Sequence, residues 1–229
     1  GGTVECIADI VISAGNATVT AECGTPFVSV SGPVINGILD CPGTTYTYTY
    51  TVTDFCNRMA SCTQVFTIAN DPPVITCPAN MTVECFADIS VDPNDAIVVT
   101  SCALGFNTVI TGPDQVGPSD CPGTTYTYTY TTTDDCGRTA SCEQVFTIDN
   151  LGPIITCPAD QVVQCFEDID ADPNDLIVVT SCGLSFFAYV KQPLITGGIP
   201  NCDGTVYTYI YVVKDECGRT AECEQQFLI

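Results

Sequence analysis

The run Cys41-Pro-Gly-Thr-Thr-Tyr-Thr-Tyr-Thr-Tyr-Thr-Val-Thr-Asp54 decides the fold of this 229-residue chain. From Thr45 to Thr51, threonine and tyrosine alternate, so hydroxyl groups occupy one face and aromatic rings the other. Strict alternation of β-branched and aromatic residues is typical of a half-buried strand. At about 3.3 Å per residue, the stretch from Thr44 to Asp54 spans roughly 36 Å. We therefore expect one long strand here.

The same run occurs three times. It returns almost unchanged at Cys121, 80 residues later, and in looser form at Cys202, after a further 81 residues. Such self-similarity indicates tandem copies of one small domain. The predicted domains lie at residues 1–69 (with the first strand missing), 70–149 and 150–229, and we call them repeats 1, 2 and 3. The joints between them are short and contain proline, so we expect a stiff rod.

Composition points to an extracellular protein. A domain of about 80 residues buries a limited core, so covalent cross-links are expected. The chain has 17 cysteines but no histidine and no CxxC pair, which indicates disulfides rather than zinc sites and hence a secreted or cell-surface location. The formal charge of −22 makes nucleic acids and anionic membranes poor partners and cations good ones. We see no signal peptide and no membrane span, and expect mature protein or part of a longer chain.

The order of elements is clearest in repeat 2. No segment has a convincing helical period, and turn residues separate short apolar stretches. Strands are expected at Pro73–Cys77, Asn80–Cys85, Ala96–Cys102, Phe106–Thr111, the Tyr/Thr run and Cys142–Ile148, with a loop at Gly112–Pro122. This arrangement predicts an all-β chain of three tandem, antiparallel β-sandwiches of the immunoglobulin type.

Three motifs carry a family resemblance. Asn70-Asp-Pro-Pro-Val-Ile-Thr-Cys77-Pro, Gly123-Thr-Thr-Tyr-Thr-Tyr and Asp135-Cys-Gly-Arg-Thr-Ala-Ser-Cys142 resemble those of hyalin-repeat (HYR) domains, especially the Cys-rich versions in large secreted surface proteins of Bacteroidota-type bacteria. The resemblance covers all three repeats. It implies an immunoglobulin-like fold and a role in extracellular adhesion or structure. Repeat 3 departs most, because Val206 and Ile210 interrupt its threonine ladder.

That fold suggests a disulfide pattern, out of fifteen that six cysteines allow. In an immunoglobulin-like sandwich the second and sixth strands meet at their far ends, whereas the first and last strands run side by side. The expected pairs are Cys23–Cys56, Cys102–Cys136 and Cys182–Cys217; Cys77–Cys142 and Cys157–Cys223; and Cys6–Cys41, Cys85–Cys121 and Cys165–Cys202. Each bond is expected to contribute about 2–4 kcal/mol.

Repeat 1 has five cysteines instead of six. The cysteine equivalent to Cys77 would lie a few residues before Gly1, so we expect Cys62 to have no partner within this chain. One interpretation is that the polypeptide continues upstream. The other is that a neighbouring chain supplies the missing strand and its thiol.

Acidic loops suggest calcium, because several hard oxygen ligands lie within a few residues of one another. The candidate ligands are Asp88, Asp92, Asn94 and Asp95 in repeat 2, Glu167, Asp168, Asp170, Asp172, Asn174 and Asp175 in repeat 3, and Asn70, Asp71, Asp149 and Asn150 at the joints. The alternative is that Asp-Pro-Asn-Asp is turn chemistry. The matching loop of repeat 1, Ser13–Asn16, lacks the carboxylates and favours that alternative.

Other motifs are weaker. Asn16 and Asn80 begin N-glycosylation sequons, which also arise by chance. An arginine recurs in one turn of every repeat and is expected to form a local ion pair, which contributes little if exposed. These pairs are Arg58 with Asp54, Arg138 with Asp135, and Arg219 with Asp215. Without histidine, a nucleophile elbow or a phosphate-binding glycine loop, the chain is not expected to be an enzyme.

The sequence thus predicts a structural component of an extracellular or cell-surface filament. Its expected partners are copies of itself or further repeats of the same chain. The alternative is the stalk of a large secreted adhesin, stiffened by calcium, whose targets would be surface glycans or cells. A filament predicts the same contacts between consecutive copies, whereas a stalk predicts none beyond the covalent linkers.

Overall fold

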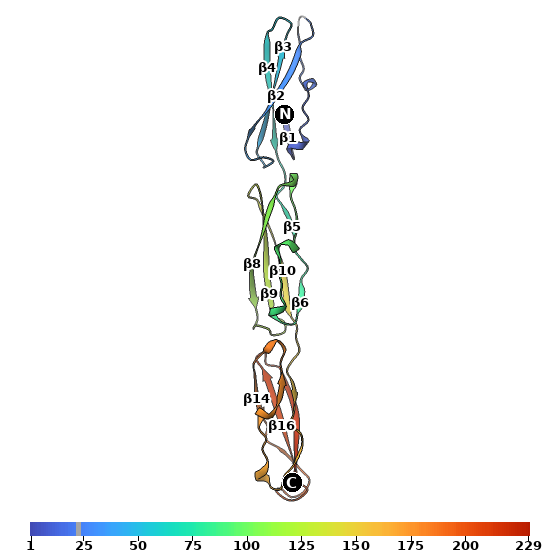
Figure 1. Cartoon of the computed structure of the whole chain (residues 1–229), viewed down its shortest axis with the longest axis vertical. Coiled ribbons are helices and arrows are strands. Elements are labelled where there is room, and N and C mark those ends of the chain that lie inside the picture. Colours follow the sequence, from blue (N-terminus) through green and yellow to red (C-terminus); the bar gives the residue numbers. More distant parts are fainter. Residues whose placement is uncertain (22–23) are drawn as a thin grey trace. The chain divides into compact units, whose positions relative to one another are not determined.

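The computed structural model describes residues 1–21 and 24–229 and is all-β, as the sequence predicts (Figure 1). The described residues contain no α-helix, and their helical elements are short 3₁₀ turns of three residues. Among the same residues, no helix has the length and the apolar character that crossing a membrane requires.

Each repeat contributes one main sheet, and the strand order is equivalent in all three. In repeat 1 it is β1 (Gly2–Val4), β4 (Met59–Ile68), β3 (Thr45–Thr53), β2 (Phe27–Asn36). In repeat 2 it is β6 (Met81–Val83), β10 (Thr139–Ile148), β9 (Thr125–Asp134), β8 (Phe106–Val116). In repeat 3 it is β12 (Gln161–Val162), β17 (Thr220–Leu228), β16 (Val206–Asp215), β14 (Phe186–Val190), with β15 (Leu194–Thr196) also on β16.

Repeats 2 and 3 each add a small two-stranded sheet. It consists of β5 (Val74–Thr76) with β7 (Ile97–Val99) in repeat 2, and of β11 (Ile154–Thr156) with β13 (Ile177–Val179) in repeat 3. Two expected disulfides occur in the structure and connect these small sheets to the main ones: Cys77–Cys142 and Cys157–Cys223, with Cα separations of 5.7 and 5.8 Å. They link the segment that follows β5 or β11 to the last strand of the same repeat.

Two local expectations were inaccurate. The first strand of each main sheet is parallel to the last one, as in the pairs β1–β4, β6–β10 and β12–β17, so the sheets are not purely antiparallel. β8 also extends to Val116, into the segment expected as a loop. In β2, the equivalent strand, pairing with β3 continues past Gly32-Pro33 by a register shift between Ser31 and Val34. A strand can absorb such residues as an irregularity instead of ending.

The Tyr/Thr run forms the second inner strand of each sheet, as expected. Its tyrosines pack into the core: the exposed fraction is 0% for Tyr46, Tyr130 and Tyr211. The ring of Tyr128 packs edge-on against Phe146 on the neighbouring strand, at a centroid distance of 5.8 Å. Aromatic pairs of this geometry stabilise a core beyond the area that they bury.

The chain divides into two compact units, and the boundary passes through repeat 2. Unit 1 comprises residues 1–78, 92–111 and 129–144, and unit 2 comprises residues 79–91, 112–128 and 145–229. Each unit therefore contains one whole repeat and the part of repeat 2 that adjoins it. The domain boundaries near residues 69 and 149 follow the sequence period and stay a prediction.

Candidate functional site: the covalent junctions between repeats

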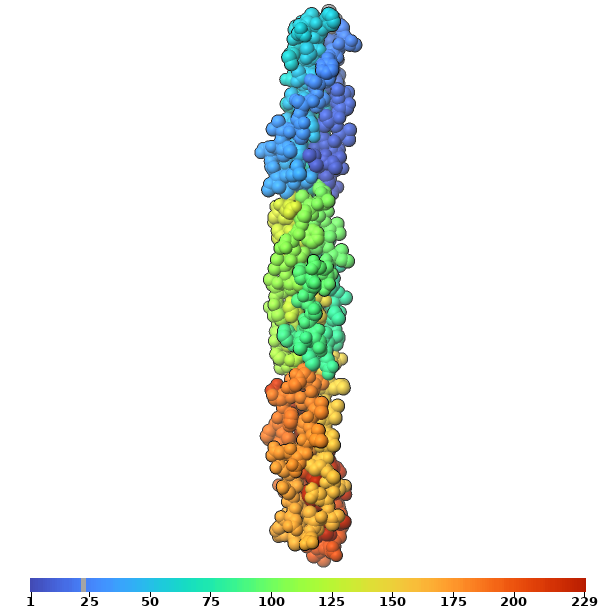
Figure 2. All heavy atoms as spheres, in the orientation of Figure 1, coloured from blue at the N-terminus to red at the C-terminus, as the bar shows by residue number. Residues whose placement is uncertain are grey.

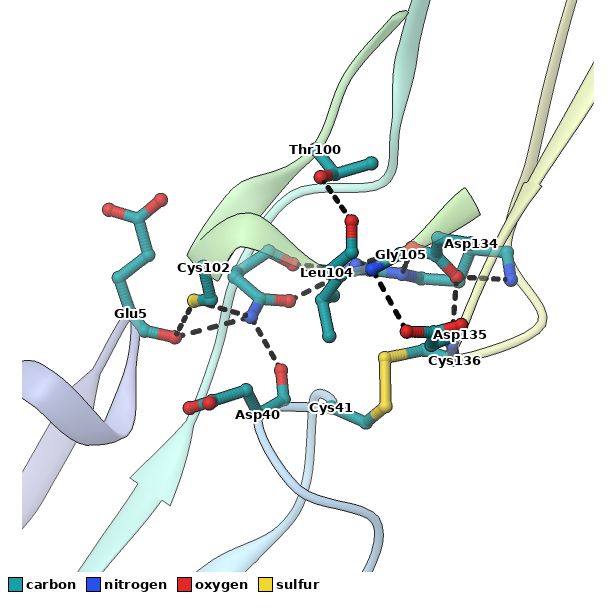
Figure 3. Close-up of polar contacts among 12 residues, drawn as sticks. Glu5, Asp40, Cys41, Thr100, Cys102, Leu104, Gly105, Asp134, Asp135 and Cys136 are labelled. Atoms are coloured by element: carbon teal, nitrogen blue, oxygen red, sulfur yellow. Dashed lines mark hydrogen bonds and ion pairs between the residues drawn. A yellow bond between two sulfur atoms is a disulfide. The ribbon is translucent and has the colours of Figure 1, made fainter. Parts of the chain in front are cut away.

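Two disulfides join repeat 1 to repeat 2 within unit 1, and Figure 3 shows the one between Cys41 and Cys136. Cys6 bonds to Cys102 and Cys41 bonds to Cys136, with Cα separations of 5.4 and 5.5 Å. Figure 2 shows the blue surface of repeat 1 bordering green and yellow-green residues of repeat 2 at this contact. We call the contact junction 1 and define it by these disulfides together with Asn70 and Arg138.

Unit 2 contains an equivalent contact between repeats 2 and 3. Cys85 bonds to Cys182 and Cys121 bonds to Cys217, both with a Cα separation of 5.4 Å. We call this contact junction 2; it also contains Asn150 and Arg219. The two junctions thus use the same cysteine positions of successive repeats.

These bonds overturn most of the expected pairing. The four pairs that the structure replaces are Cys6–Cys41, Cys85–Cys121, Cys102–Cys136 and Cys182–Cys217. The prediction confined every bond to a single sandwich. In the structure, each pair of cysteines instead meets the pair of the adjoining repeat, because a disulfide requires Cα atoms within about 7 Å and the junction provides that proximity.

The remaining cysteines are exposed. In the described part of the chain, Cys56, Cys62, Cys165 and Cys202 form no disulfide. The expected pair Cys165–Cys202 is therefore wrong. The expected pair Cys23–Cys56 includes Cys23, which lies outside the described residues. Cys62 is one of these four cysteines, and the absence of a partner for it in the whole chain stays a prediction.

A 3₁₀ turn positions the first cysteine of each junction. The backbone N–H of Cys85 donates to Oδ2 of Asp88 at 3.0 Å, and Phe86–Asp88 form the turn. Repeat 1 has the same arrangement, with Cys6 donating to Asp9 at 2.9 Å. The carboxylate thus accepts a backbone donor at the start of the turn. Asp88, a candidate calcium ligand by sequence, orients a junction cysteine.

The second cysteine lies in an unusual backbone conformation. Cys102 and Cys182 have φ values of 56° and 57°, in the left-handed region that few residues other than glycine occupy. The Thr100 hydroxyl donates to the Leu104 carbonyl at 2.6 Å and closes the turn around Cys102. The same backbone conformation thus occurs at the equivalent cysteine of both junctions.

The turn around Cys136 is organised by Asp134. Its Oδ1 accepts from the backbone N–H groups of Cys136 at 3.0 Å and Arg138 at 2.9 Å. Its Oδ2 accepts from Nε of Arg138 at 2.9 Å. The prediction that Arg138 pairs with Asp135 is therefore wrong. Oδ2 of Asp135 instead accepts from the backbone N–H of Gly105 at 2.9 Å. Asp134, not Asp135, occupies the repeat position of Asp54.

The other two arginines pair as expected. Nε of Arg58 lies 2.7 Å from Oδ2 of Asp54, and Nε of Arg219 lies 2.8 Å from Oδ2 of Asp215. The carboxylate of Asp215 is fully buried, like that of Asp134. The ion pairs of repeats 2 and 3 are therefore parts of the junctions.

Asn70, in the joint, connects the two repeats through its side chain. Its Nδ2 donates to the carbonyl oxygens of Asp40 at 2.8 Å and Glu5 at 3.2 Å, both in repeat 1. The backbone carbonyl oxygen of Asn70 and its side-chain Oδ1 both accept from Nη1 of Arg138 at 2.9 Å. An amide suits this position because it presents donors and an acceptor at once.

Asn150 repeats this arrangement in unit 2. Its Nδ2 donates to the carbonyl oxygens of Asp120 at 2.7 Å and Glu84 at 3.1 Å. Its carbonyl oxygen and Oδ1 accept from Nη1 of Arg219 at 2.8 Å. Sequence reasoning treated both asparagines as candidate calcium ligands and missed this role. The available signal was that an asparagine and an arginine recur at the same repeat positions.

The charge of the turn is stabilised by its hydrogen bonds. Burial alone raises the pKa of Asp134, but the backbone N–H of Arg138, its guanidinium and the backbone N–H of Cys136 outweigh it, so this pKa is lowered from 3.8. The pKa of Asp54 is also lowered, chiefly by the backbone N–H of Arg58. Both carboxylates are therefore charged at neutral pH.

The acidic loops form local hydrogen bonds, and calcium binding by them stays a prediction. In the described residues, no three side chains among His, Cys, Asp and Glu gather in a way that could hold a metal ion. Asp92 instead accepts from the backbone N–H and the side-chain amide of Asn94, at 2.8 and 2.7 Å. Asp172 and Asn174 do the same in repeat 3. These contacts are the turn chemistry that was the alternative.

Both sequon asparagines are exposed, and each makes a hydrogen bond to the backbone. Oδ1 of Asn80 accepts from the Val145 N–H at 2.9 Å, and Nδ2 of Asn16 donates to the Val11 carbonyl at 3.3 Å. Glycosylation of either residue stays a prediction.

A hollow of about 240 Å³ lies beside Cys62. Its lining includes Val28, Tyr50, Val52 and residues 17–20. By the repeat period, residues 17–20 correspond to 96–99, the region of β7 against which β5 pairs in repeat 2. The hollow thus occupies the position that β5 fills in repeat 2, next to the cysteine equivalent to Cys142.

One family model matches part of the chain. Residues 1–68 match the model described as "HYR-like domain with 4 cysteines". The match covers most of repeat 1 and agrees with the resemblance seen in the sequence. A comparison with curated proteins found no match.

The solved structures that match the chain are distant from it. The extracellular domain of protocadherin γB4 matches with a TM-score of 0.31 and 12% identity, over 89% of this chain and 44% of that one. A cis-dimer structure of protocadherin γB7 EC3–6 matches with a TM-score of 0.32 and 14% identity, over 92% of this chain and 68% of that one. The structure of human CDH23 EC21–23 matches with a TM-score of 0.27 and 16% identity, over 80% of this chain and 74% of that one. Likeness at this level does not indicate function. Repeat 1 matches a HYR-like domain, and the chain is a disulfide-rich all-β repeat protein.

Proposed function

We propose that this chain is a structural component of an extracellular or cell-surface filament built from disulfide-rich, immunoglobulin-like repeats. One observation carries the proposal: junctions 1 and 2 contain the same two disulfides and the same Asn–Arg contacts. The same contacts between successive repeats are what a filament requires, and a stalk held only by its linkers does not need them.

The junction chemistry suits a mechanical role. Domains joined by a linker alone normally move relative to one another. Here each junction adds two covalent bonds, so three connections oppose bending and separation at the same contact. The bonds of junction 1 close loops of 96 and 95 residues. In the chain-entropy model, a loop of this length stabilises the folded state by about 4–5 kcal/mol per bond.

The location follows from the same bonds. Disulfides persist in oxidising compartments, and six of them are present in the described residues. A net charge of −22 keeps such a protein soluble and repels nucleic acids and anionic membranes. Both features support a secreted or cell-surface protein, of the kind that the Bacteroidota-type HYR resemblance implies.

The second candidate is the stalk of a large secreted adhesin. The match of repeat 1 to a HYR-like domain supports it, because such a stalk is also a row of these repeats. In that case surface glycans or cells are bound by another part of the protein, and the repeats hold that part away from the cell.

An antibody against the chain tests the proposal on intact, unpermeabilised source cells. We expect gold-labelled antibody to decorate extracellular fibres, and an absence of surface labelling on cells whose lysate contains the chain would contradict the proposal. Gels of the labelled material distinguish the two candidates. On a denaturing gel with reductant, a filament of separate copies runs as a short chain, whereas an adhesin stalk remains one long polypeptide.

A further inference from the structure

Two aromatic rings lie side by side on the surface of repeat 3. Phe187 and Tyr189 are alternate residues of β14, so their side chains lie on the same face of the main sheet. The ring centroids are 5.9 Å apart and the ring planes are inclined by 27°, which is a stacked arrangement. The exposed fractions are 67% for Phe187 and 40% for Tyr189. We call these two rings the aromatic platform.

The sheet beneath the platform is well packed. Tyr189 pairs with Val212 on β16, and directly paired residues share a face of the sheet. Val212 is only 2% exposed, and Tyr211 and Val213, which point to the opposite face, are 0% exposed. The platform therefore stands on a strand that is covered on both faces, and not on a loop.

The chain has two lysines, and both lie beside the platform. Lys214 is the partner of Phe187 in the sheet. Lys191 follows Tyr189 by two residues, and its Nζ lies 2.7 Å from Oε1 of Glu222. Within the described residues, Lys214 forms no ion pair. Two groups that can donate hydrogen bonds thus flank the rings.

A hollow of about 300 Å³ adjoins the platform. Its lining includes Phe187, Ser185, Lys214 and Glu216. An aromatic ring, a hydroxyl, an ammonium group and a carboxylate therefore border one space. Apolar contact area with a few polar groups around it is the usual composition of a small-molecule site, in which the polar groups fix the orientation of the ligand.

Repeats 1 and 2 lack this combination. The positions of the two rings are occupied by Asn107 and Val109 in repeat 2 and by Phe27 and Ser29 in repeat 1. Neither repeat contains a lysine. The common fold of the three repeats therefore does not require the platform, and a role specific to repeat 3 accounts for it.

We propose that repeat 3 binds an uncharged oligosaccharide, with consecutive sugar rings stacked on Phe187 and Tyr189. A pyranose has an apolar face of C–H groups, which packs against an aromatic ring, and hydroxyl groups at its edge, which require polar partners. Ser185, Lys214 and Glu216 supply such partners beside the Phe187 ring. The inference goes beyond both roles proposed above, which assign no ligand to these repeats.

The charges around the rings favour an uncharged ligand. The net charge of −22 repels anions, and the two lysines beside the platform repel cations. Lys191 is paired with Glu222, and Lys214 and Glu216 line the same hollow, so charges of both signs are close together. These groups can bind hydroxyls without selecting a charged ligand.

A protein partner fits this surface less well. Stable protein interfaces bury about 800 Å² on each partner, much more than two rings provide. β14 is an edge strand of the main sheet, but Lys191 and Pro193 follow it directly. Lysine and proline at an edge oppose the addition of a further strand. The edge is thus protected, whereas the face that carries the rings is open.

The test is a titration of the full chain, labelled with ¹⁵N, with uncharged hexasaccharides of β-linked glucose, mannose, xylose and galactose. Amide signals in NMR spectra report the position of binding and the affinity. We expect at least one of these sugars to shift the signals of β14 and Lys214 in a saturable manner and to leave those of β2 unchanged. Hexagalacturonate, which carries a carboxylate on every ring, should bind more weakly.

Three variants are compared using the sugar that binds. Phe187→Ala removes the more exposed ring and should weaken binding about tenfold. Tyr189→Phe keeps a ring at its position and should retain most of the affinity. Phe27→Ala is the matched control, because it removes a ring that is 70% exposed at the equivalent position of repeat 1 and should leave binding unchanged. The amide spectrum of each free variant verifies that it is folded.

Four results would overturn the proposal. They are the absence of saturable shifts with all four uncharged sugars, unchanged affinity in a folded Phe187→Ala chain, an equal loss in Phe27→Ala, and tighter binding of hexagalacturonate. Self-association without sugar that Phe187→Ala abolishes would also overturn it, because the platform would then be a contact between copies. None of these results bears on the antibody labelling that tests the structural role.

Discussion

Repeats 1 and 2 contain the same hairpin turn in two different settings. In repeat 1 the side chain of Arg58 is 71% exposed and that of Asp54 is 17% exposed. In repeat 2 the corresponding values are 20% for Arg138 and 0% for Asp134. The hydrogen bonds within the turn are the same, but Arg138 also donates to Asn70 in the joint and Cys136 is bonded to repeat 1. What differs is the neighbouring repeat.

The comparison shows how one local motif serves two purposes. The carboxylate and the backbone N–H groups form the turn in either setting, because those contacts are four residues apart or fewer. The energetic value of the arginine depends on burial: an exposed ion pair contributes little, whereas breaking a buried pair is strongly destabilising. Docking against the adjoining repeat thus converts a turn that only shapes a hairpin into a structural joint.

The largest effect is expected from removing the covalent bond that distinguishes the two turns. Replacing Cys41 and Cys136 together by serine opens a loop of 95 residues and should lower the unfolding free energy of unit 1 by about 4 kcal/mol. Urea unfolding followed by tyrosine fluorescence measures the change. The matched control is Cys56→Ser, which removes a cysteine from the exposed turn; an equal loss in that variant would show that the junction bond is not responsible.

The next effect is expected at the arginines. Arg138→Gln removes the donor to both oxygens of Asn70 and leaves the buried carboxylate of Asp134 without its ion partner, so we expect a loss of about 3 kcal/mol in unfolding free energy. Arg58→Gln, the control in the exposed turn, should change stability far less. Similar losses in both variants, measured by the same urea titration, would contradict the role assigned to the junction.

A smaller effect is expected at Asn70. Asn70→Ala deletes the side-chain donor to the carbonyl oxygens of Asp40 and Glu5, and the acceptor for Arg138, at a cost of about 1–2 kcal/mol. Asn150→Ala should produce a matching loss in unit 2, since its contacts are the same. Hydrogen exchange at the two joints reports each loss separately. If exchange at the joints is unchanged, the asparagines do not hold the repeats together.

The smallest effect is a dependence on acid. Because the folded pKa of Asp134 lies below its ordinary value of 3.8, its stabilising contribution is present above that value and is lost as pH falls through the folded pKa. The stability of the native chain should therefore be flat above about pH 5 and decline in more acidic solution. Asp134→Asn should lower stability at pH 7, and the gap to the native chain should narrow as the pH falls. A gap that stays constant down to pH 2 would mean that the carboxylate charge is not involved.

Much of the fold was predictable from local patterns. The Tyr/Thr alternation located the long strand because side chains in a strand alternate with period two, and burial of Tyr46 and Tyr130 confirms that one face is the core. The bond Cys77–Cys142 was also predictable, because it lies within one repeat and connects segments that the fold brings side by side. The described part of repeat 1 has no strand equivalent to β5, and the hollow at Cys62 lies at the position that β5 fills in repeat 2.

The sequence by itself determined the all-β class and the repeat period, because period-two alternation and tandem similarity are visible along one chain. Only the tertiary structure decided that Cys6 bonds to Cys102 and Cys41 to Cys136. These bonds bridge 96 and 95 residues, longer than the 80-residue period, and depend on which surfaces of successive repeats meet. Asn70 shows the same limit: its residue type permits a turn, a metal ligand or a bridge, and its position against Arg138 selects the bridge.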